Sequence, residues 1–504
     1  MSTNVWQERQ GGQQPPAGGS KILDKGKALL GKVKQRSFEY GLSQVFAFLA
    51  KSSDKNYLRL IWLMEKYSDS PQQKVTLQWL RHYLSPGQPG IDYINRVLGS
   101  LHPNVRRRYL AGFIGNLLFR GTENVAVQEQ VENEMGCSPK LVVISPTDAC
   151  NYRCIGCYAD AYGRCSILSE ELVQRIIDEC RILGVRFFVI SGGEPFVWKP
   201  LLSIFERNPD CTFQVYTNGS KIDRAMAEKL VSLGNVCPCI SVEGFQEETD
   251  ARRGAGAWAN VLEAWKNLRE AGGIYGFSAT ATSKNYLTIT SEEFFDEMIK
   301  QGVHYGWYFI YIPTGASPDM ELFLSPEQRN EFRARISRLR NTKPLLAGDF
   351  WNDGCLTDGC LAGGRHYFHV NAKGDVEPCV FSHFTVDNIR DKSVREVLAS
   401  PFFKELRERT ELESRGNRLA PCSIIDHPHV LREAVLNNGA RPSHEGADTI
   451  ITSLSPILEK CGREYERLTQ PIFENEYRPW YDLFQGKVKL TETLAETVKD
   501  QSRT

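Results

Sequence analysis

Three cysteines, Cys150, Cys154 and Cys157, lie within eight residues of one another. Thiolate ligands suit soft metal centres, which in proteins are zinc, copper(I) or iron–sulfur clusters. Zinc usually takes four ligands, often from two separated cysteine pairs. A 4Fe–4S cluster held by three cysteines instead leaves one iron free to bind a substrate or cofactor. The spacing therefore predicts a metal-binding loop, with structural zinc or unrelated buried thiols as the alternative.

Further motifs follow this loop along the chain. Ser191-Gly-Gly-Glu-Pro195 combines glycines, which let the backbone approach a ligand, with a carboxylate that can accept hydrogen bonds from an ammonium group. Ser241-Val-Glu-Gly244 offers polar groups that could hold hydroxyls. Arg253 supplies a guanidinium, which suits a carboxylate. The Gly-Gly-Glu-Pro motif alone could be only a turn, and the arginine could be solvated.

In this order and spacing, the motifs resemble the radical S-adenosylmethionine (SAM) superfamily. The resemblance covers about residues 100–435 and implies that the three cysteines hold a 4Fe–4S cluster. It implies that SAM is bound by Tyr158, Gly192, Gly193, Glu194, Pro195, Ser241, Glu243 and Arg253. Relatives with extra clusters commonly have an aspartate where this chain has Glu243.

The resemblance also implies the chemistry. In the superfamily the reduced cluster passes one electron to SAM, whose cleavage gives methionine and a 5′-deoxyadenosyl radical that removes hydrogen from an unactivated C–H bond. Because the cofactor performs this chemistry and the protein orients it, no catalytic acid or base is assigned. A reductant such as ferredoxin or flavodoxin is the expected partner.

A second set of cysteines, Cys360, Cys379 and Cys422, follows. The segment from Cys360-Leu-Ala-Gly to Gly-Asp-Val-Glu-Pro-Cys379 predicts a β-hairpin with a cysteine at each end. It resembles the SPASM or twitch type of auxiliary-cluster domain, which implies one auxiliary cluster. Cys355, His383 or an open iron could complete the ligand set. The alternative is a hairpin stabilised by zinc.

The alternation of short apolar runs with helical stretches after about residue 140 predicts an α/β fold. We expect a partial (β/α)6 TIM-like barrel, whose chemistry lies at the carboxyl ends of the strands, with an all-helical N-terminal extension and a small auxiliary iron–sulfur domain. The expected strands are Leu141–Ile144, Phe187–Ile190, Phe213–Tyr216, Val236–Val242, Ile274–Ala281 and Tyr308–Ile312. The expected domains are a disordered tail (1–20), a helical region (21–135), the radical SAM core (136–341), the auxiliary domain (342–440) and a helical extension (441–504).

The composition is that of a globular protein. The chain has 504 residues, 41% of them hydrophobic, and its 61 basic and 61 acidic side chains balance. This balance argues against nucleic acid as a partner of the whole chain. No apolar run is long enough to span a bilayer and no signal peptide is recognised, so we expect a cytoplasmic protein.

Local basic stretches leave the substrate open. Residues 21–36 and the segment that begins at Arg106-Arg-Arg108 pair basic with apolar side chains, which is typical of helices at a membrane surface and equally of helices packed on the barrel. We therefore expect an enzyme with an unknown substrate, hydrophobic or lipid in nature, with peripheral membrane contact as a further expectation. The alternatives are a peptide-modifying enzyme and a non-catalytic metal scaffold or redox sensor.

Overall fold

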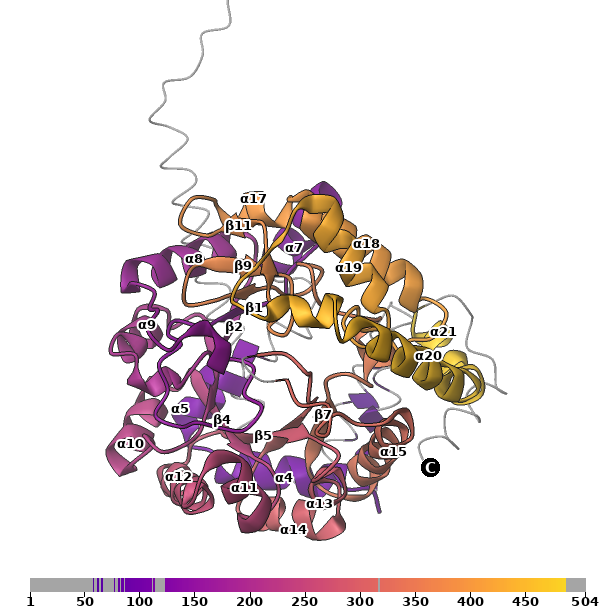
Figure 1. Cartoon of the computed structure of the whole chain (residues 1–504). Coiled ribbons are helices and arrows are strands. Elements are labelled where there is room, and N and C mark those ends of the chain that lie inside the picture. The colour runs from indigo at the N-terminus through magenta and orange to yellow at the C-terminus, as the bar shows by residue number, and fades with distance from the viewer. Residues whose placement is uncertain are drawn as a thin grey trace, which may run out of the picture.

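The computed structural model describes residues 87–110, 112–113, 123–315 and 318–485, together with scattered residues between 58 and 85. Its centre is a curved sheet in the order β11-β9-β8-β1-β2-β3-β4-β5-β6-β7. Strands β1 to β7 run parallel, and helices cover the outside of the ring that they form (Figure 1). The expected parallel α/β barrel is therefore confirmed.

The bounds of these elements follow the predicted pattern closely. The strands are β1 (Leu141–Ile144), β2 (Phe187–Ile190), β3 (Thr212–Thr217), β4 (Val236–Val242), β5 (Gly276–Ala281), β6 (Tyr305–Ile310) and β7 (Leu346–Asp349). The outer helices are α8 (Glu170–Ile182), α9 (Leu201–Arg207), α10 (Arg224–Leu233), α11 (Gln246–Arg253), α12 (Ala257–Ala271), α13 (Tyr286–Ile289), α14 (Glu292–Lys300) and α15 (Pro326–Thr342).

Strand β3 is one residue longer at each end than expected and β5 begins two residues later, and two further differences are larger. Strand β6 begins at Tyr305, three residues earlier than expected. The predicted start is too late because Gly306 interrupts the apolar run. In the structure Gly306 belongs to the strand and lies directly against the ring of Phe277 in β5. Strand β7 is not among the expected strands, because Leu346-Ala-Gly-Asp349 has only two apolar residues. It pairs with β6 and extends the sheet beyond it. The parallel sheet therefore continues past residue 341.

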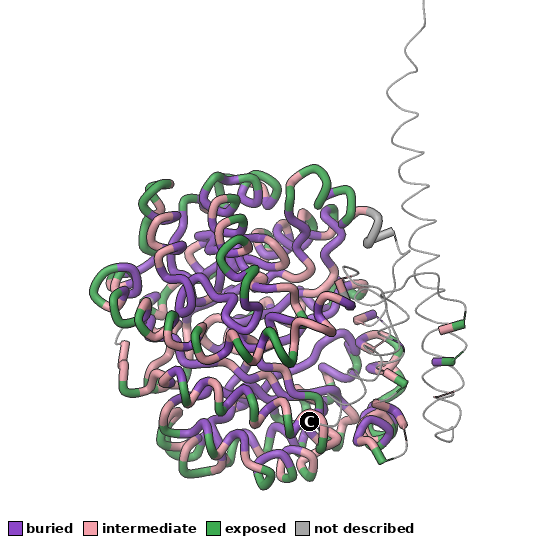
Figure 2. Tube along the Cα trace, turned by 90° about the vertical axis from the view of Figure 1, so that its right-hand side faces the viewer, coloured by how far each residue is buried: buried purple, intermediate pink, exposed green. Residues whose placement is uncertain are grey.

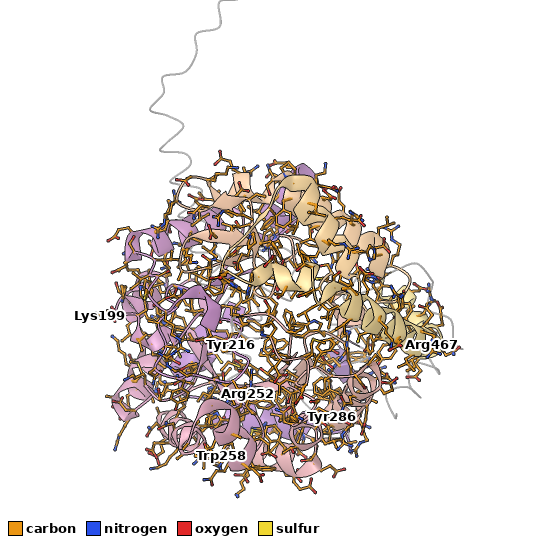
Figure 3. The ribbon with its side chains drawn as sticks, in the orientation of Figure 1. Lys199, Tyr216, Arg252, Trp258, Tyr286 and Arg467 are labelled. Atoms are coloured by element: carbon orange, nitrogen blue, oxygen red, sulfur yellow. The ribbon has the colours of Figure 1, made fainter. Side chains whose placement is uncertain are left out.

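The inside of the ring is filled by side chains that meet across it. Trp307 of β6 donates from Nε1 to Oε1 of Gln214 in β3 at 3.3 Å, and one layer further along the rings of Tyr216 and Phe309 are 5.6 Å apart. Strands β4 and β5 separate β3 from β6 in the sheet, so these contacts cross the interior. Figure 3 places Tyr216 towards the centre of the ring and Arg467 at the rim of the molecule.

The N-terminal segment closes the amino end of the barrel. It consists of α4 (Gly90–Ser100), α5 (Pro103–Val105), a π-helix (Arg106–Leu110) and α7 (Glu123–Met135). Tyr109 is buried with Cys237, near the start of β4. Arg106 and Arg108 donate to the backbone carbonyls of Leu98 and Leu233. Arg108 thus contacts the barrel and Arg106 contacts α4, whereas residues 114–122, which hold most of the apolar side chains of this segment, lie outside the described residues.

The first basic stretch, residues 21–36, lies outside the described residues. In the part of the chain that the structure describes, no helix is both long and apolar enough to cross a membrane.

The auxiliary region is joined directly to the barrel. Its expected hairpin is formed by β8 (His369–Val370) and β9 (Asp375–Glu377), and β8 pairs in parallel with β1. Strand β11 (Asp387–Asn388) extends this edge, while β10 (Phe384–Thr385) and β12 (Arg441–Pro442) pair separately. The helices are α16 (Gly354–Thr357), α17 (Val394–Leu398), α18 (Pro401–Ser414), α19 (Pro428–Asn438), α20 (Ser455–Ile472) and α21 (Arg478–Phe484). Figure 2 shows buried chain through the middle of the molecule and exposed residues on the outer turns.

Two buried histidines should make the fold sensitive to acid. Burial lowers the pKa of His304 to about 3 and that of His383 to about 4, whereas both titrate near 6.5 in an unfolded chain. Between these values the unfolded state binds more protons, so stability falls as the pH falls. From pH 7 to 5.5 these two histidines should lower the free energy of unfolding by about 2–3 kcal/mol, measured by urea denaturation. His366, whose pKa burial lowers to about 4, adds to this decrease.

The variant His304→Gln should lessen this pH dependence, because it removes one of the protons taken up on unfolding. The exposed His102 serves as the control, since His102→Asn should leave the slope unchanged. An equal slope in all three proteins would contradict the assignment.

Candidate functional site

The three-cysteine loop begins at the carboxyl end of β1. Cys150, Cys154 and Cys157 are partly exposed and interact electrostatically with one another. The loop is held from α11: the backbone N–H of Ile155 donates to the carbonyl of Arg252 at 2.9 Å, and Nε of Arg252 donates to the carbonyl of Ile155 at 3.1 Å. The barrel and α11 thus present three thiols at one point, a donor set that fits a 4Fe–4S cluster.

Five of the six cysteines with predicted cluster roles share a local hydrogen bond, in which the backbone N–H two residues later donates to the sulfur. The pairs are Tyr152 to Cys150, Ala159 to Cys157, Ala362 to Cys360, Phe381 to Cys379 and Ile424 to Cys422. Such bonds favour the charged form of the sulfur, which is the form that binds metal. Both cysteine sets therefore have backbone geometry suited to thiolate ligands.

The Gly-Gly-Glu-Pro segment lies against the start of the cysteine loop. The N–H of Gly193 donates to the carbonyl of Thr147 at 2.9 Å, and that of Glu194 to the carbonyl of Ala149 at 2.8 Å. A Cβ on Gly193 would stand 2.1 Å from the Ala149 oxygen. The glycines are thus required for contact between two loops of the chain, in addition to any approach to a ligand.

The carboxylate of Glu194 is buried and faces the end of β3. It accepts hydrogen bonds from the Thr217 hydroxyl, the Asn218 N–H and the Phe196 N–H at 2.7, 2.8 and 3.1 Å. Burial raises its pKa despite these bonds. A carboxylate has about four acceptor positions, so one remains for a ligand donor. Pro195 begins the short 3₁₀-helix that follows.

Glu243 is 1% exposed at the end of β4 and is paired with two arginines. Its Oε1 accepts from Nη1 of Arg252 at 2.6 Å and from Nε of Arg253 at 2.8 Å. Its Oε2 is buried without a hydrogen-bond partner. Because a buried, unpaired carboxylate oxygen is costly, it indicates a position that a bound donor would fill, which fits SAM. Figure 3 labels Arg252 towards the centre of the ring.

The other residues expected at SAM lie nearby. The Ser241 hydroxyl contacts that of Ser278 in β5 at 3.1 Å. The hydroxyl of Tyr158 contacts that of Ser191 at 2.8 Å, and its ring lies 5.4 Å from that of Phe381 in the auxiliary region. Arg253 approaches Cys154 with Nη1 at 4.0 Å. Tyr158 and Arg253 thus border the three-cysteine loop, whereas the contact of Ser241 is with the neighbouring strand β5.

The structure also brings the second cysteine set together. Cys360, Cys379 and Cys422 interact electrostatically with one another, and burial raises the pKa of their thiols to about 11, 12 and 12. Cys355 instead lies in a separate apolar cluster with Leu419, among others. Metal binding to the three thiols would displace their protons.

The candidate fourth ligands have other partners. Cys355 is 2% exposed among apolar side chains. The ring of His383 contacts the Val380 carbonyl at 3.0 Å and the His444 ring nitrogen at 2.6 Å. Among the described residues, no three His, Cys, Asp or Glu side chains converge on a single metal ion. A four-iron cluster does not need such convergence, since each cysteine binds a different iron.

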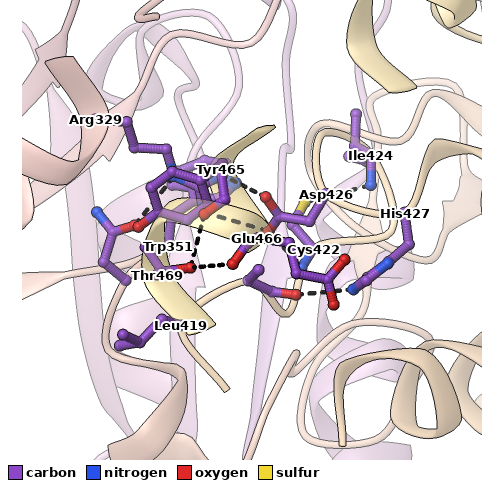
Figure 4. Close-up of polar contacts among 12 residues, drawn as sticks. Arg329, Trp351, Leu419, Cys422, Ile424, Asp426, His427, Tyr465, Glu466 and Thr469 are labelled. Atoms are coloured by element: carbon purple, nitrogen blue, oxygen red, sulfur yellow. Dashed lines mark hydrogen bonds and ion pairs between the residues drawn. The ribbon is translucent and has the colours of Figure 1, made fainter. Parts of the chain in front are cut away.

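Asp426 holds the loop that carries Cys422 (Figure 4). Its Oδ2 accepts from the backbone N–H of Cys422 at 2.9 Å, and both its oxygens accept from Arg329 of α15. The Arg329 guanidinium lies 3.7 Å from the centre of the Tyr465 ring. All three side chains are at most 5% exposed. A buried ion pair therefore joins the barrel, α20 and the Cys422 loop.

A second buried network connects the two cysteine sets. Glu377, two residues before Cys379, accepts from the Tyr162 hydroxyl at 2.8 Å and contacts Nδ1 of His369 at 2.7 Å. The other ring nitrogen of His369 contacts the hydroxyl of Ser145, just beyond β1, at 2.8 Å. Burial would raise the pKa of Glu377, but its contacts with His369 lower it. The hairpin is thereby tied to the segment that follows the first cysteine loop.

Sequence reasoning assigns no role to Arg252 or Asp426. The only sequence signal for Arg252 is its place beside Arg253 before a glycine. From the sequence, either arginine could be the one that binds the carboxylate of SAM. Asp426 has no local signal, because its partner Arg329 is 97 positions away.

Comparison with known protein families agrees with these sites. Residues 144–305 match the radical SAM superfamily, and residues 360–423 match the SPASM iron–sulfur cluster-binding domain. The first match contains the three-cysteine loop and the second contains Cys360, Cys379 and Cys422. The expected cofactors, SAM, its 4Fe–4S cluster and an auxiliary iron–sulfur cluster, are confirmed by these domains.

Individual relatives are named for different activities. The chain is 27% identical over 325 residues to an AdoMet-dependent heme synthase of Methanosarcina barkeri, covering 58% of this chain and 90% of the relative. It is 28% identical over 304 residues to the mycofactocin maturase MftC of Mycobacterium ulcerans, covering 56% and 80%.

Solved structures show a weaker likeness. The crystal structure of Streptococcus suis SuiB bound to S-adenosylmethionine matches 61% of this chain and 80% of its own, with 14% identity and a TM-score of 0.48. The domain matches therefore identify a radical SAM domain at residues 144–305 of this chain and an iron–sulfur cluster-binding SPASM domain at residues 360–423.

Proposed function

We propose that this radical SAM enzyme removes hydrogen from a C–H bond of a flat, apolar substrate held at the carboxyl end of the barrel. Cys150, Cys154 and Cys157 would hold the SAM-binding cluster, and the three cysteines of the SPASM domain an auxiliary one. Bound there, the cluster and SAM supply one-electron cleavage of SAM and hydrogen abstraction. A one-electron reductant is required as partner.

The chain's own residues would bind and orient SAM. The free Oε2 of Glu243 would accept a hydrogen bond from a hydroxyl or ammonium group of SAM, while Arg253 offers positive charge beside Cys154. Glu194 has one acceptor position left. Tyr158 presents a hydroxyl beside the cysteine loop, and Ser241 presents one near the end of β4. Each of these groups can thus donate or accept a hydrogen bond with SAM, which carries both an ammonium and a carboxylate group.

The observation that carries the proposed substrate class is a cluster of aromatic rings between the two cysteine sets, whose planes are inclined to one another by 37° to 76°. The ring of Phe309 lies 5.6 Å from that of Tyr216 and 5.3 Å from that of Phe350. Phe381 lies 6.3 Å from Phe309 and 5.4 Å from Tyr158, which follows Cys157. All but Phe381 are partly exposed. Such rings favour stacking with a flat, apolar ligand.

Two relatives are named for making planar macrocycles, which fit such a cluster. These are the heme synthase and a Fe-coproporphyrin III synthase, also of Methanosarcina barkeri, which is 34% identical over 150 residues and is covered to 38% of its length. We therefore take a tetrapyrrole as the substrate class to test. Peptide modification is the second candidate, supported by the similarity to the mycofactocin maturase.

The test uses the full chain with its clusters reconstituted anaerobically. Fe-coproporphyrin III should bind, seen as a shift of its visible absorption, and should increase formation of 5′-deoxyadenosine in the presence of dithionite and SAM. Phe309→Ala should weaken macrocycle binding by roughly two- to tenfold, because an aromatic contact contributes about 0.5–1.5 kcal/mol.

The control for this test is Trp258→Ala, which removes an aromatic ring at the edge of the molecule (Figure 3) and should leave macrocycle binding unchanged. Equal binding by Phe309→Ala and the unaltered chain would contradict the aromatic subsite. Stimulation of SAM cleavage by peptides and not by the macrocycle would favour the second candidate.

A further inference from the structure

We infer that Tyr367 sets the reduction potential of the auxiliary cluster, through a hydrogen bond from its hydroxyl to the sulfur of Cys379. The inference rests on the proposed function, because it needs an auxiliary cluster on Cys360, Cys379 and Cys422. It assigns Tyr367 a positioning and tuning role, since the residue would act through a ligand.

The geometry of Tyr367 is fixed by its surroundings. Its side chain is 3% exposed, and its hydroxyl oxygen lies 2.8 Å from Sγ of Cys379. The backbone N–H of Tyr367 donates to the carbonyl of Leu361 at 3.0 Å, which ties it to the segment that begins at Cys360. Its ring packs 6.2 Å from that of Phe350. The hydroxyl is therefore held at the sulfur by both its backbone and its ring.

The phenol is a neutral hydroxyl at physiological pH, because an ordinary tyrosine has a pKa of about 10 and the side chain of Tyr367 is buried. A neutral phenol donates a hydrogen bond to the sulfur and is a poor ligand for iron.

This hydrogen bond distinguishes Cys379 from Cys360 and Cys422, the other two cysteines of its set. Its sulfur accepts from the Phe381 backbone N–H, as four other cluster cysteines do from theirs, and additionally from the Tyr367 hydroxyl. Hydrogen bonds to cluster sulfurs withdraw electron density and are one of the protein's means of setting cluster potentials. Because the reduced cluster carries more negative charge, the donor stabilises it and raises the potential.

The experiment measures the auxiliary cluster alone. The variant Cys154→Ala removes the SAM-binding cluster, and Tyr367→Phe is added to it. An anaerobic redox titration followed by electron paramagnetic resonance should show a lower midpoint potential with unchanged iron content. A tenfold loss in the equilibrium constant for one-electron reduction would appear as a shift of about 59 mV.

Tyr308→Phe provides the matched control. It removes the hydroxyl of another buried tyrosine, which donates to the Ile289 carbonyl at 2.7 Å, and it should leave the potential unchanged. An unchanged potential in Tyr367→Phe would overturn the inference. Loss of auxiliary iron in that variant would also overturn it, because Tyr367 would then be a ligand or a structural support. If the Cys154→Ala protein itself holds no cluster, the proposed auxiliary site fails instead.

Discussion

Replacing Cys154 with alanine should abolish the cleavage of SAM and reduce the iron content from about eight to about four atoms per chain. The loop would keep only two of its three thiols, too few for a cluster that already leaves one iron open. The fold should persist, because Cys154 is partly exposed and its sulfur makes only a long contact, 4.0 Å, with Nη1 of Arg253. Iron analysis and chromatography of 5′-deoxyadenosine provide the measurements.

Cys165 is the matched control for this substitution. It is exposed and lies eight residues beyond Cys157, so Cys165→Ala should retain both the iron and the cleavage activity. Substantial 5′-deoxyadenosine formation by Cys154→Ala would show that the three-cysteine loop does not carry the chemistry.

Replacing Asp426 with alanine should lower the free energy of unfolding by about 3–5 kcal/mol, because it leaves the buried Arg329 guanidinium without its counter-ion. The same change removes the acceptor for the backbone N–H of Cys422. The Cys422 loop should therefore loosen, and auxiliary iron should be lost more readily to a chelator. Chemical denaturation and the rate of iron release test the two effects separately.

The exposed Asp448 gives a control of the same residue type, since Asp448→Ala should change stability by at most about 0.5 kcal/mol. Asp426→Asn can keep the acceptor for Cys422 while removing the charge, so it separates the ion pair from the loop contact. Equal stability of Asp426→Ala and Asp448→Ala would show that the Arg329 pair contributes little.

The sequence predicts the barrel well because its evidence is local. A buried parallel strand such as β4 is a run of apolar residues, and α8 begins at Ser169, whose side chain accepts from the Leu172 N–H. The short strand β7 cannot be predicted in this way, because its residues show no run of apolar side chains. Its extended conformation depends on its pairing with β6.

The candidate site divides in the same way. The cysteine loop is a local motif, so its members can be named from their spacing. Cys355 looks close to the auxiliary set in the sequence because it precedes Cys360 by only five residues. The turn after α16 takes Asp358 into the left-handed region with φ 57°, and Cys355 packs into the separate cluster. The direction of the chain after a turn and the partner of a buried charge depend on tertiary packing. They cannot be predicted from the spacing of residues in the sequence.

The pairing of β8 with β1 has a consequence for how far apart the two redox centres can be. Val143 of β1 stands opposite His369 of β8, and neighbouring strands of a sheet lie about 4.8 Å apart. The three-cysteine loop follows β1, and the second cysteine set lies around the hairpin that begins with β8. The distance between the two cysteine sets is therefore determined by the pairing of strands in one sheet, and not by a hinge. If a substrate binds between the two cysteine sets, as proposed above, the space available to it would be set by this strand pairing and by the side chains that line the space.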